Sequence, residues 1–328
     1  SEVSAAPHQD TTLVRTLAAM GTVVSVQVVG HGASARARRE RARAVDRAIA
    51  WFSAVEAVCS RFDDTSELRR VCVHVGTPVA VSPMLFEAVQ FAVAVADAAE
   101  GAFDPTIGAH MESRGFHHDY RSQAVVASGI ADDDTVSYRD IELDADTRSI
   151  TLHRPLLLDL GAVAKGLAID MAVRELATYT DFAIDAGGDL YLSGLNEQAT
   201  PWTVGVRDPA TPTVVRERIT VSDAAVCTSG DYERPGHLVS ASARTGTTTS
   251  PAPRTRGANE THTADDHAVR AASVTTIAPS AMVADAMGTA AYVLGPAAGI
   301  PFLEAHDIRG LILTTSGERR ATHDWPHD

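Results

Sequence analysis

The stretch Leu158-Asp159-Leu160-Gly161-Ala162-Val163-Ala164-Lys165-Gly166-Leu167-Ala168-Ile169-Asp170 decides how we interpret the fold. An apolar run ends in an acid and meets a small-residue turn, and Lys165 then opens a segment with apolar residues at helical spacing. This pattern predicts a strand, a tight loop and a helix. The first N–H groups of such a helix lack partners and form a site for an anion, to which Lys165 adds a compact positive charge. A surface lysine on a plain strand-to-helix connection is the alternative, because the Gly-Lys-Ser/Thr ending of a P-loop is missing.

Length, composition and charge indicate a globular protein and limit the classes of partner that it can bind. The chain has 328 residues, of which 45% are hydrophobic, and its formal net charge is −14. The length alone would allow about two domains. An acidic chain offers no basic face to nucleic acid or to an anionic membrane, so neither is expected as a main partner. The arginine run from Arg36 to Arg47 occupies the polar side of a predicted helix and does not change this expectation.

The cysteines and the apolar runs indicate in which cellular compartment the protein is expected. Cys59, Cys72 and Cys227 leave an odd thiol and no spaced framework, which argues against a disulfide-stapled secreted fold. No run approaches the roughly 18 apolar residues of a membrane span, and residues 1–10 show no export or lipidation pattern. As the chain stands, we expect a cytoplasmic protein without a transmembrane segment. Because it opens on Ser1, a trimmed precursor that acts outside the cytoplasm stays open.

Apolar periodicity predicts an α+β fold in which mixed or antiparallel sheets pack with helices. Strands are expected at 22–29, 71–81, 141–143, 150–152, 182–192, 202–206, 219–226, 273–278 and 311–315, with a bend at Gly187-Gly188. Helices are expected at 33–59 and 83–96, after Lys165, after Ser280 and at 297–305. The polar stretch 246–269 is far longer than a connection of about 4–6 residues and is interpreted as a mobile insertion. With residues 1–12 as a flexible terminus, 13–328 is expected to form one domain.

Two further groups could carry chemistry. Asp285 and Thr289 are spaced i, i+4 on the helix that Ser280 starts, so they share a face. A carboxylate and a hydroxyl are hard oxygen ligands that Mg²⁺ accepts beside waters and substrate phosphates; solvent-facing or back-bonded side chains are the alternative. His237 is a candidate general base, because an unperturbed imidazole titrates near physiological pH. A hydrogen-bonded structural histidine is the alternative there.

Seven short motifs follow one another along the chain: Met20-Gly21-Thr22, Ser60 to Leu68, Gly101 to Thr106, Asp159 to Gly166, Asp185 to Leu190, Thr228 to Tyr232 and Ala284 to Thr289. Their content and order resemble the ApbE family, the FAD:protein FMN transferases. Any one motif would be weak, but seven in order are specific, and together they span Met20 to about Gly295. The resemblance implies an ApbE-like fold with the flavin in a cleft between two lobes.

The resemblance also implies substrates, cofactor and site residues. FAD would donate FMN to a threonine hydroxyl of an acceptor protein, with release of AMP and with Mg²⁺ as cofactor. His237 would take the proton from the threonine, and Lys165 would help to hold the phosphates for in-line attack. Mg²⁺ would be bound by the Ala162 carbonyl and by the side chains of Asp285 and Thr289. The residues that would contact FAD are Met20, Phe62, Ala102, Phe103, Asp104, Asp159, Lys165 and Val239.

The chain departs from the family pattern after His237. The family usually shows His-x-x-Asp-Pro followed shortly by Thr-Gly. Here Ser240-Ala241 replaces Asp-Pro, and the Thr-Gly pair, in Arg244-Thr245-Gly246, lies further along the chain than in the family pattern. Gly288 stands where some relatives carry a further acid. Two alternatives to Mg²⁺-dependent flavin transfer therefore stay open. One is a non-catalytic FAD-binding protein, and the other is an FAD pyrophosphatase that gives FMN and AMP.

Overall fold

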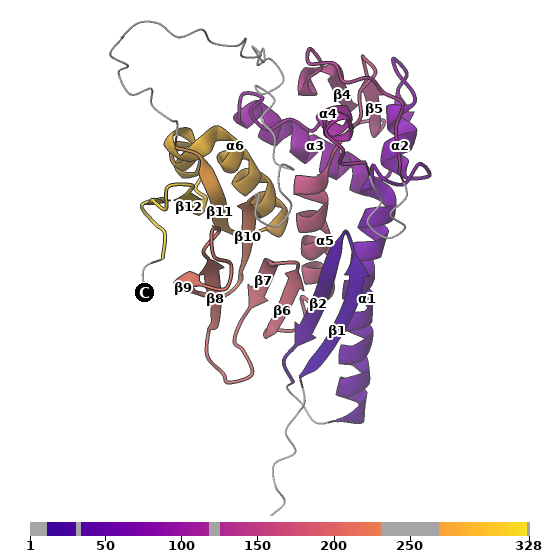
Figure 1. Ribbon diagram of the computed structural model, residues 1–328. Helices are drawn as coiled ribbons and strands as arrows, with labels where there is room; N and C mark the ends of the chain where they lie inside the picture. Colours follow the sequence, from indigo (N-terminus) through magenta and orange to yellow (C-terminus); the bar gives the residue numbers. More distant parts are fainter. Residues whose placement is uncertain (1–11, 31–33, 118–124, 231–268, 327–328) are drawn as a thin grey trace, which may run out of the picture.

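Eight strands form one antiparallel sheet in the computed structural model, which describes residues 12–30, 34–117, 125–230 and 269–326 (Figure 1). In spatial order the strands are β1 (Leu13–Ala19), β2 (Thr22–Val28), β6 (Phe182–Ala186), β7 (Asp189–Ser193), β10 (Ala224–Gly230), β11 (Ala271–Ala278), β12 (Arg309–Thr314) and β13 (Arg319–Ala321). Each strand pairs antiparallel with its neighbour. The predicted α+β class with antiparallel sheets is confirmed.

Three long helices cover one face of this sheet: α1 (Ala35–Cys59), α5 (Gly161–Glu175) and α6 (Ala281–Ala305). α1 packs on β1 and β2, α5 on β6 and β7, and α6 on β10, β11 and β12. α5 contacts both other helices, and Figure 1 shows it between them. The main hydrophobic core lies between these helices and the sheet, with Phe52, Ile169 and Ile184 fully buried in it.

A two-stranded ribbon packs on the large sheet through a second, smaller core. The ribbon consists of β8 (Trp202–Arg207) and β9 (Val215–Val221), which pair with each other. Val206 and Ile219 of the ribbon pack with Trp325 and with Val226 and Leu311 of the sheet. This core is separate from the one under the helices, so the middle of the large sheet is covered on both faces.

A smaller lobe stands at one end of the large sheet, at the top of Figure 1. Its three-stranded sheet has the order β3 (Val79–Ala80), β5 (Ser149–Leu152), β4 (Ile141–Asp144), and the β4–β5 hairpin is the one predicted. Around it lie α2 (Glu67–Cys72), α3 (Pro83–Ala98), α4 (Gly108–Ser113) and a 3₁₀ turn at Tyr138–Asp140. α3 joins this lobe to the rest, because it contacts α1, α5 and α6.

Serine caps start three of the helices, α1, α3 and α6. The Oγ atom of Ser34 accepts a hydrogen bond from the Ala37 N–H at 3.0 Å, and that of Ser280 accepts one from Val283 at 3.3 Å. Ser82 caps α3 in the same way, with Pro83 in the first turn. A serine oxygen at this position satisfies a backbone donor that the helix itself leaves unpaired, which fixes where each helix begins.

Two tight hairpins bring separate motifs together at one end of the large sheet. Met20 and Gly21 form the two-residue turn between β1 and β2 with φ of 53° and 75°, as the twist of a hairpin favours. Gly187 and Gly188 form the turn between β6 and β7, also with positive φ, which confirms the predicted bend. A Cβ on Gly187 would lie 2.2 Å from the Thr22 hydroxyl oxygen, so the two turns pack closely and glycine is required.

Three of the predicted strands are wrong in detail. Of the expected strand 71–81, the first two residues are the end of α2 and only Val79–Ala80 is a strand, because Ser66 caps a helix that buries Leu68 and Val71 on one face. The expected strand 219–226 is two strands with a turn at Ser222 and Asp223. The expected strand before Lys165 is buried, but within the described part of the chain it makes a single bridge, from Leu157 to Ile107. The insertion 246–269 and the flexible terminus lie almost wholly outside the described residues.

One described helix, α6, is long and apolar enough to cross a membrane by length and composition alone. It packs on three strands and on α5, and more than half of its apolar window is buried inside the protein. Its course is broken at Gly295, with φ 76°, two residues before the expected helix 297–305. These contacts are those of a core helix, and a core helix passes the same test.

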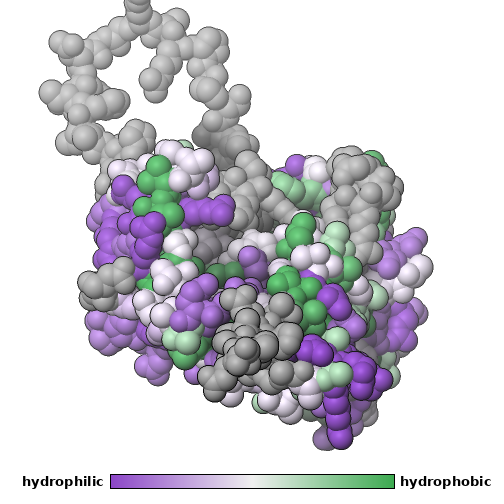
Figure 2. Space-filling view, turned by 90° about the horizontal axis from the view of Figure 1, so that it is seen from below, coloured by the Kyte–Doolittle hydropathy of each residue, from purple (hydrophilic) through white to green (hydrophobic). Residues whose placement is uncertain are grey.

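The outer surface mixes polar and apolar residues. Figure 2 shows green apolar patches separated by purple and white residues on the face seen from below. Val14 and Val23, on the β1–β2 hairpin, are 46% and 64% exposed. Single exposed apolar side chains of this kind are normal on soluble domains and need no partner to explain them.

Replacing Gly166 with alanine is expected to lower the free energy of unfolding by about 3 kcal/mol, because an added methyl group overpacks the α5–α6 contact. A Cβ there would lie 2.4 Å from the Met282 Cα and 2.6 Å from the Ala281 carbonyl oxygen. Chemical denaturation measures the change. Arg174→Ala, at an exposed position of the same helix, is the control and should stay within about 0.5 kcal/mol of the native protein. Equal stability of Gly166→Ala would show that the two helices can separate without cost.

Candidate active site

The start of α6 is fixed to α5 by one acid, Asp170. Its Oδ1 accepts a hydrogen bond from the Ala281 N–H at 2.8 Å. Its Oδ2 accepts from the Met282 N–H at 3.0 Å and from the Ser280 hydroxyl at 2.6 Å. A carboxylate at a helix N-terminus satisfies free backbone donors and complements the helix dipole. The side chains one turn further along α6 are thereby held against the first turns of α5.

Lys165 and Asp285 meet at this junction, as the sequence predicts. Lys165 forms an ion pair with Asp189, the first residue of β7, and its side chain is 27% exposed. Asp285 is close enough that Lys165 and Asp285 each shift the other's pKa. Asp189 and Asp285 are both buried, at 2% and 6% exposure. One ammonium therefore faces two carboxylates contributed by the sheet and by α6.

Burial and charge set the ionisation of these groups. Burial alone would lower the pKa of Lys165, but the carboxylates of Asp189 and Asp285 outweigh it and raise that pKa, so Lys165 stays protonated. Burial raises the pKa of Asp285 to about 8; Lys165 lowers it and Asp189 adds a smaller rise. Burial also raises the pKa of the nearby Cys227 well above its ordinary value, which makes this thiol a poor nucleophile.

The oxygen atoms on α6 fit a divalent cation. Asp285 Oδ2 is buried and has no hydrogen-bond partner among the residues that the structure describes, which is costly for a carboxylate unless a cation or donor joins it. Thr289 lies one turn further on, with its hydroxyl 3.0 Å from that of Ser229. Ala162, half-buried at the start of α5, stays a predicted carbonyl ligand. The described residues contain no group of three or more His, Cys, Asp and Glu that could hold a metal.

Asp159 lies two residues before the first residue of α5, and two hydrogen-bond donors fix its carboxylate. Arg61 Nε donates to Asp159 Oδ2 at 2.7 Å, and the Gly161 N–H donates to Oδ1 at 2.8 Å. The Arg61 guanidinium also lies over the Phe62 ring, 4.0 Å from its centroid. Arg61 is buried, at 7% exposure, so the ion pair and the ring contact form one rigid unit. This unit places Phe62 beside the phosphate-binding turn predicted from the sequence.

Replacing Arg61 with methionine is expected to lower the free energy of unfolding by about 2 kcal/mol. Breaking a buried ion pair leaves a carboxylate without its counter-charge, and the partial exposure of Asp159 reduces the usual cost of about 3–5 kcal/mol. Urea denaturation measures the loss. Arg70→Met removes a half-exposed pair with Glu67 and should cost less than about 1 kcal/mol. Equal losses in the two variants would contradict a structural role for the buried pair.

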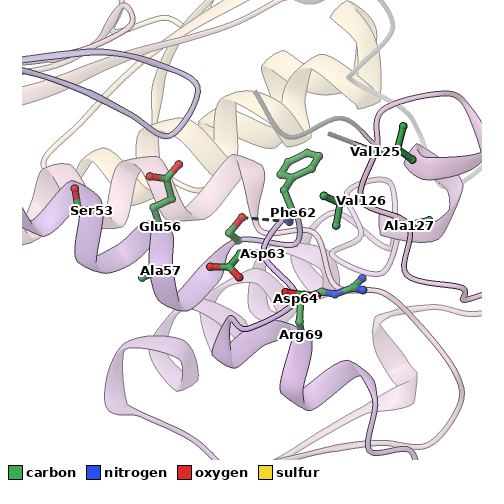
Figure 3. Close-up of a pocket in the computed structure, with 11 residues that line it drawn as sticks. Ser53, Glu56, Ala57, Phe62, Asp63, Asp64, Arg69, Val125, Val126 and Ala127 are labelled. Carbon is green, nitrogen blue, oxygen red and sulfur yellow. Dashed lines mark hydrogen bonds between the residues drawn. The ribbon is translucent and has the colours of Figure 1, made fainter. Parts of the chain in front are cut away.

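A cavity of about 580 Å³ opens next to Phe62 (Figure 3). Its walls come from α1, from the loop after α1 and from the segment 125–127. Ser53, Glu56 and Ala57 line it on the α1 side, and Figure 3 shows the Phe62 ring between them and Val126. The volume suits part of a nucleotide-sized ligand. An aromatic ring in its wall can stack on a planar heterocycle.

The matched family is described as the ApbE family, and its model covers residues 20–312. The chain belongs to the ApbE family. A Treponema pallidum protein named FAD:protein FMN transferase is 30% identical over 308 residues, which cover 84% of this chain and 77% of that protein. A Vibrio cholerae protein of the same name is 28% identical over 276 residues, covering 79% of this chain and 75% of that protein.

Solved structures of ApbE proteins share the fold. The flavin transferase ApbE from Vibrio cholerae superposes with a TM-score of 0.76 at 23% identity, over 96% of this chain and 98% of that one. The ApbE protein from Thermotoga maritima gives a TM-score of 0.75 at 24% identity, over 95% of this chain and 97% of that one. The ApbE-like fold predicted from the motifs is confirmed.

The first and third ApbE motifs lie in turns. Met20, in the β1–β2 turn, donates its N–H to Glu56 Oε1 at 2.9 Å, which places the turn beside the cavity. Ala102 and Phe103 follow α3, with Phe103 buried. Asp104 is buried and accepts hydrogen bonds from the N–H and hydroxyl of Thr106 and from the Tyr138 N–H. The Asp104 carboxylate thus holds the loop in place through these hydrogen bonds. Contact of Met20, Ala102, Phe103 and Asp104 with FAD stays a prediction.

Two predicted ApbE site residues lie outside the described residues. These are His237, the candidate general base, and Val239, a candidate FAD contact. The roles given to them by the family resemblance stay predictions.

Sequence reasoning missed three residues of the ApbE site: Arg61, Asp170 and Asp189. Arg61 and Asp189 stood inside motifs that were recognised, but only the distant chain contacts show what they hold. Asp170 likewise shows its role only through contacts with the distant start of α6. The sequence also marks Lys165 as unusual, because it is the only lysine among the 28 Lys and Arg residues and the other 27 are arginine.

Proposed function

We propose that this protein is an Mg²⁺-dependent flavin transferase, which moves FMN from FAD to a threonine hydroxyl of an acceptor protein and releases AMP. The observation that carries the proposal is the meeting of Lys165 with Asp285 and Thr289 at the α5–α6 junction. A lysine and a hard-oxygen metal site side by side are what a diphosphate requires. Membership of the ApbE family and the names of its relatives support the flavin donor and the protein acceptor.

The arrangement of the site fits an elongated dinucleotide. The start of α5 offers phosphate the positive end of its helix dipole. Its Gly161 N–H already donates to Asp159, and its Val163 and Ala164 N–H groups donate to the Leu160 carbonyl oxygen. Asp159 joins this turn to Arg61 and Phe62, and Phe62 opens into the 580 Å³ cavity. The diphosphate of FAD would lie near Lys165, with one of its ring systems toward Phe62. Both positions agree with the contacts implied by the family motifs.

The chemistry is a phosphoryl-type transfer in which the protein positions and stabilises charge. The threonine Oγ forms a bond to the phosphorus of the FMN half, and the bond from that phosphorus to the bridging oxygen breaks. The bridging oxygen leaves with AMP and takes the bonding electron pair. The hydroxyl proton goes to a base, a role that the family pattern gives to His237. Lys165 would hold phosphate oxygens during the step. When bound, Mg²⁺ would neutralise charge on the diphosphate and on the departing AMP.

Incubation with FAD and Mg²⁺, with and without a threonine-bearing acceptor protein, tests the proposal. Flavin transfer predicts AMP in solution and flavin that stays on the acceptor after denaturation. An acceptor variant with alanine in place of the threonine is the matched control. EDTA should stop the reaction, because the cation is required.

Two other outcomes would overturn transfer. AMP together with free FMN, at the same rate with and without acceptor, would indicate the pyrophosphatase reaction. Tightly bound, unchanged FAD would indicate a binding protein, which the replacement of the usual Asp-Pro by Ser240-Ala241 would then explain.

A further inference from the structure

Asp189 is a buried acid to which neither the composition nor the family motifs gave a role. It is the first residue of β7, directly after the Gly187-Gly188 turn, and is 2% exposed. Its carboxylate makes contacts in two directions. Oδ2 is ion-paired with Lys165 on α5, and Oδ1 accepts a hydrogen bond from the Thr228 N–H of β10 at 3.1 Å. Asp189 therefore connects the sheet to the helix that carries the lysine.

The backbone that presents Asp189 is itself fixed. Asp185 Oδ1 accepts a hydrogen bond from the Gly188 N–H at 2.8 Å, which closes the turn before it. β7 then pairs with β6 on one side and with β10 on the other. A carboxylate on such a segment has little freedom, so it can impose a position on a more flexible partner.

Lys165 is such a partner. A lysine ammonium sits on a flexible four-carbon stem and has three rotatable donors, and holding the stem in one rotamer costs about 2 kcal/mol of side-chain entropy. Asp189 takes one donor and leaves two for phosphate oxygens. The chain uses arginine at its 27 other Lys and Arg positions. Lys165 instead presents a compact ammonium, which is ion-paired with Asp189.

The charge of Asp189 distinguishes positioning from simple anion binding. A site built only to attract a diphosphate would gain from fewer carboxylates, since each one repels phosphate. Asp189 places one carboxylate beside the ammonium at the junction, and Asp285 adds a second once it loses its proton. An acid at position 189 therefore works against binding of the substrate, and its benefit has to come from where it holds the ammonium.

We infer that Asp189 is a positioning residue of the transfer reaction, which acts through Lys165 by fixing the ammonium where the transferred phosphate develops charge. The inference rests on the proposed function, because it assigns Lys165 to the diphosphate of FAD. It predicts that loss of Asp189 affects turnover and not affinity for substrate.

Asp189→Asn is the variant that tests it, because the amide oxygen can still accept from the Thr228 N–H. We expect kcat for AMP release to fall about 100-fold, the size of effect that a misplacement of about 1 Å produces. The KM for FAD should change less than about threefold, and ADP without metal should bind at least as tightly as to the native protein. Asp223→Asn, in the exposed turn before β10, is the matched control and should keep native kinetics. A rise in KM with unchanged kcat would overturn the inference.

A double-mutant cycle separates positioning from a structural role. In a Lys165→Met background, Asp189→Asn should cause no further loss of kcat, because the group through which it acts is gone. Multiplicative losses would mean that Asp189 acts independently of Lys165 and would overturn the inference. Thermal unfolding of each variant shows whether a lost fold explains a lost rate.

A measurement that needs no turnover distinguishes failure of this inference from failure of the proposed function. Because Lys165 is the only lysine in the chain, lysine labelled with ¹³C at Cε gives a single side-chain NMR signal. Relaxation of that signal should report a rigid side chain in the native protein and a mobile one in Asp189→Asn. An equally rigid lysine in the variant would overturn the positioning role. A native protein with a rigid lysine but without AMP release would overturn the proposed function and leave the contact itself confirmed.

Discussion

Asp285→Ala is expected to lower the rate of Mg²⁺-dependent AMP release about 1,000-fold and to leave the fold intact. A bound cation stabilises transition-state charge by several kcal/mol, and each 1.36 kcal/mol corresponds to a factor of ten in rate. Asp285 is the buried carboxylate whose Oδ2 lacks a partner among the described residues, so its removal would take away the anionic Mg²⁺ ligand that we propose on α6. The rate is measured by AMP release from FAD at saturating Mg²⁺.

The stability of the same variant gives an independent check. Replacing a buried, partly uncompensated carboxylate with a small apolar group removes a desolvation cost, so the melting temperature without metal should not fall. Asp189 still neutralises Lys165 in this variant. Glu304→Gln, at the exposed end of α6, is the control and should keep the native rate. Unchanged AMP release by Asp285→Ala would remove Asp285 from the metal site.

The fold was predictable from the sequence where a local signal and the tertiary contacts agree. The serine caps of α3 and α6 and the Gly187-Gly188 turn are short-range features, and each lies where predicted. The stretch 71–81 failed because its β-branched residues favour a strand, whereas Ser66 caps a helix that buries Leu68 and Val71. Propensity over a few residues is weaker than a cap combined with a buried face.

The candidate site was predictable only in part, for a physical reason. Lys165, Asp285 and Thr289 carry recognisable chemistry at recognisable spacing, and the structure places them at one helix junction. Asp189 pairs with Lys165, and Arg61 pairs with Asp159. These pairs join residues 24 and 98 positions apart in the chain. No spacing rule in a single sequence identifies such pairs. Residue type alone suggests only a solvated charge.

Mg²⁺ affinity is expected to fall about tenfold for each pH unit below about 8, because the ion binds the carboxylate form of Asp285 and must displace its proton. Burial raises the pKa of this acid to about 8 in the folded protein, against an ordinary value of 3.8. Lys165 stays protonated through this range, since its pKa is raised as well, and therefore adds no pH dependence. Titration of Mg²⁺ at pH 6, 7, 8 and 9, followed by the rise in melting temperature, measures the affinity.

The stability of the metal-free protein should change with pH in the opposite direction. Between about pH 4 and 8 the folded chain holds a proton on Asp285 that the unfolded chain has lost, so the free energy of unfolding decreases as pH rises through this range. Above the folded pKa the decrease is complete. Mg²⁺ therefore stabilises the protein most at pH 9, where the carboxylate is free, and least at pH 6. Asp285→Asn, which keeps the shape but cannot ionise, should lose this part of both pH dependences. A shift in melting temperature with Mg²⁺ that is equal at pH 6 and pH 9 would mean that another group holds the ion.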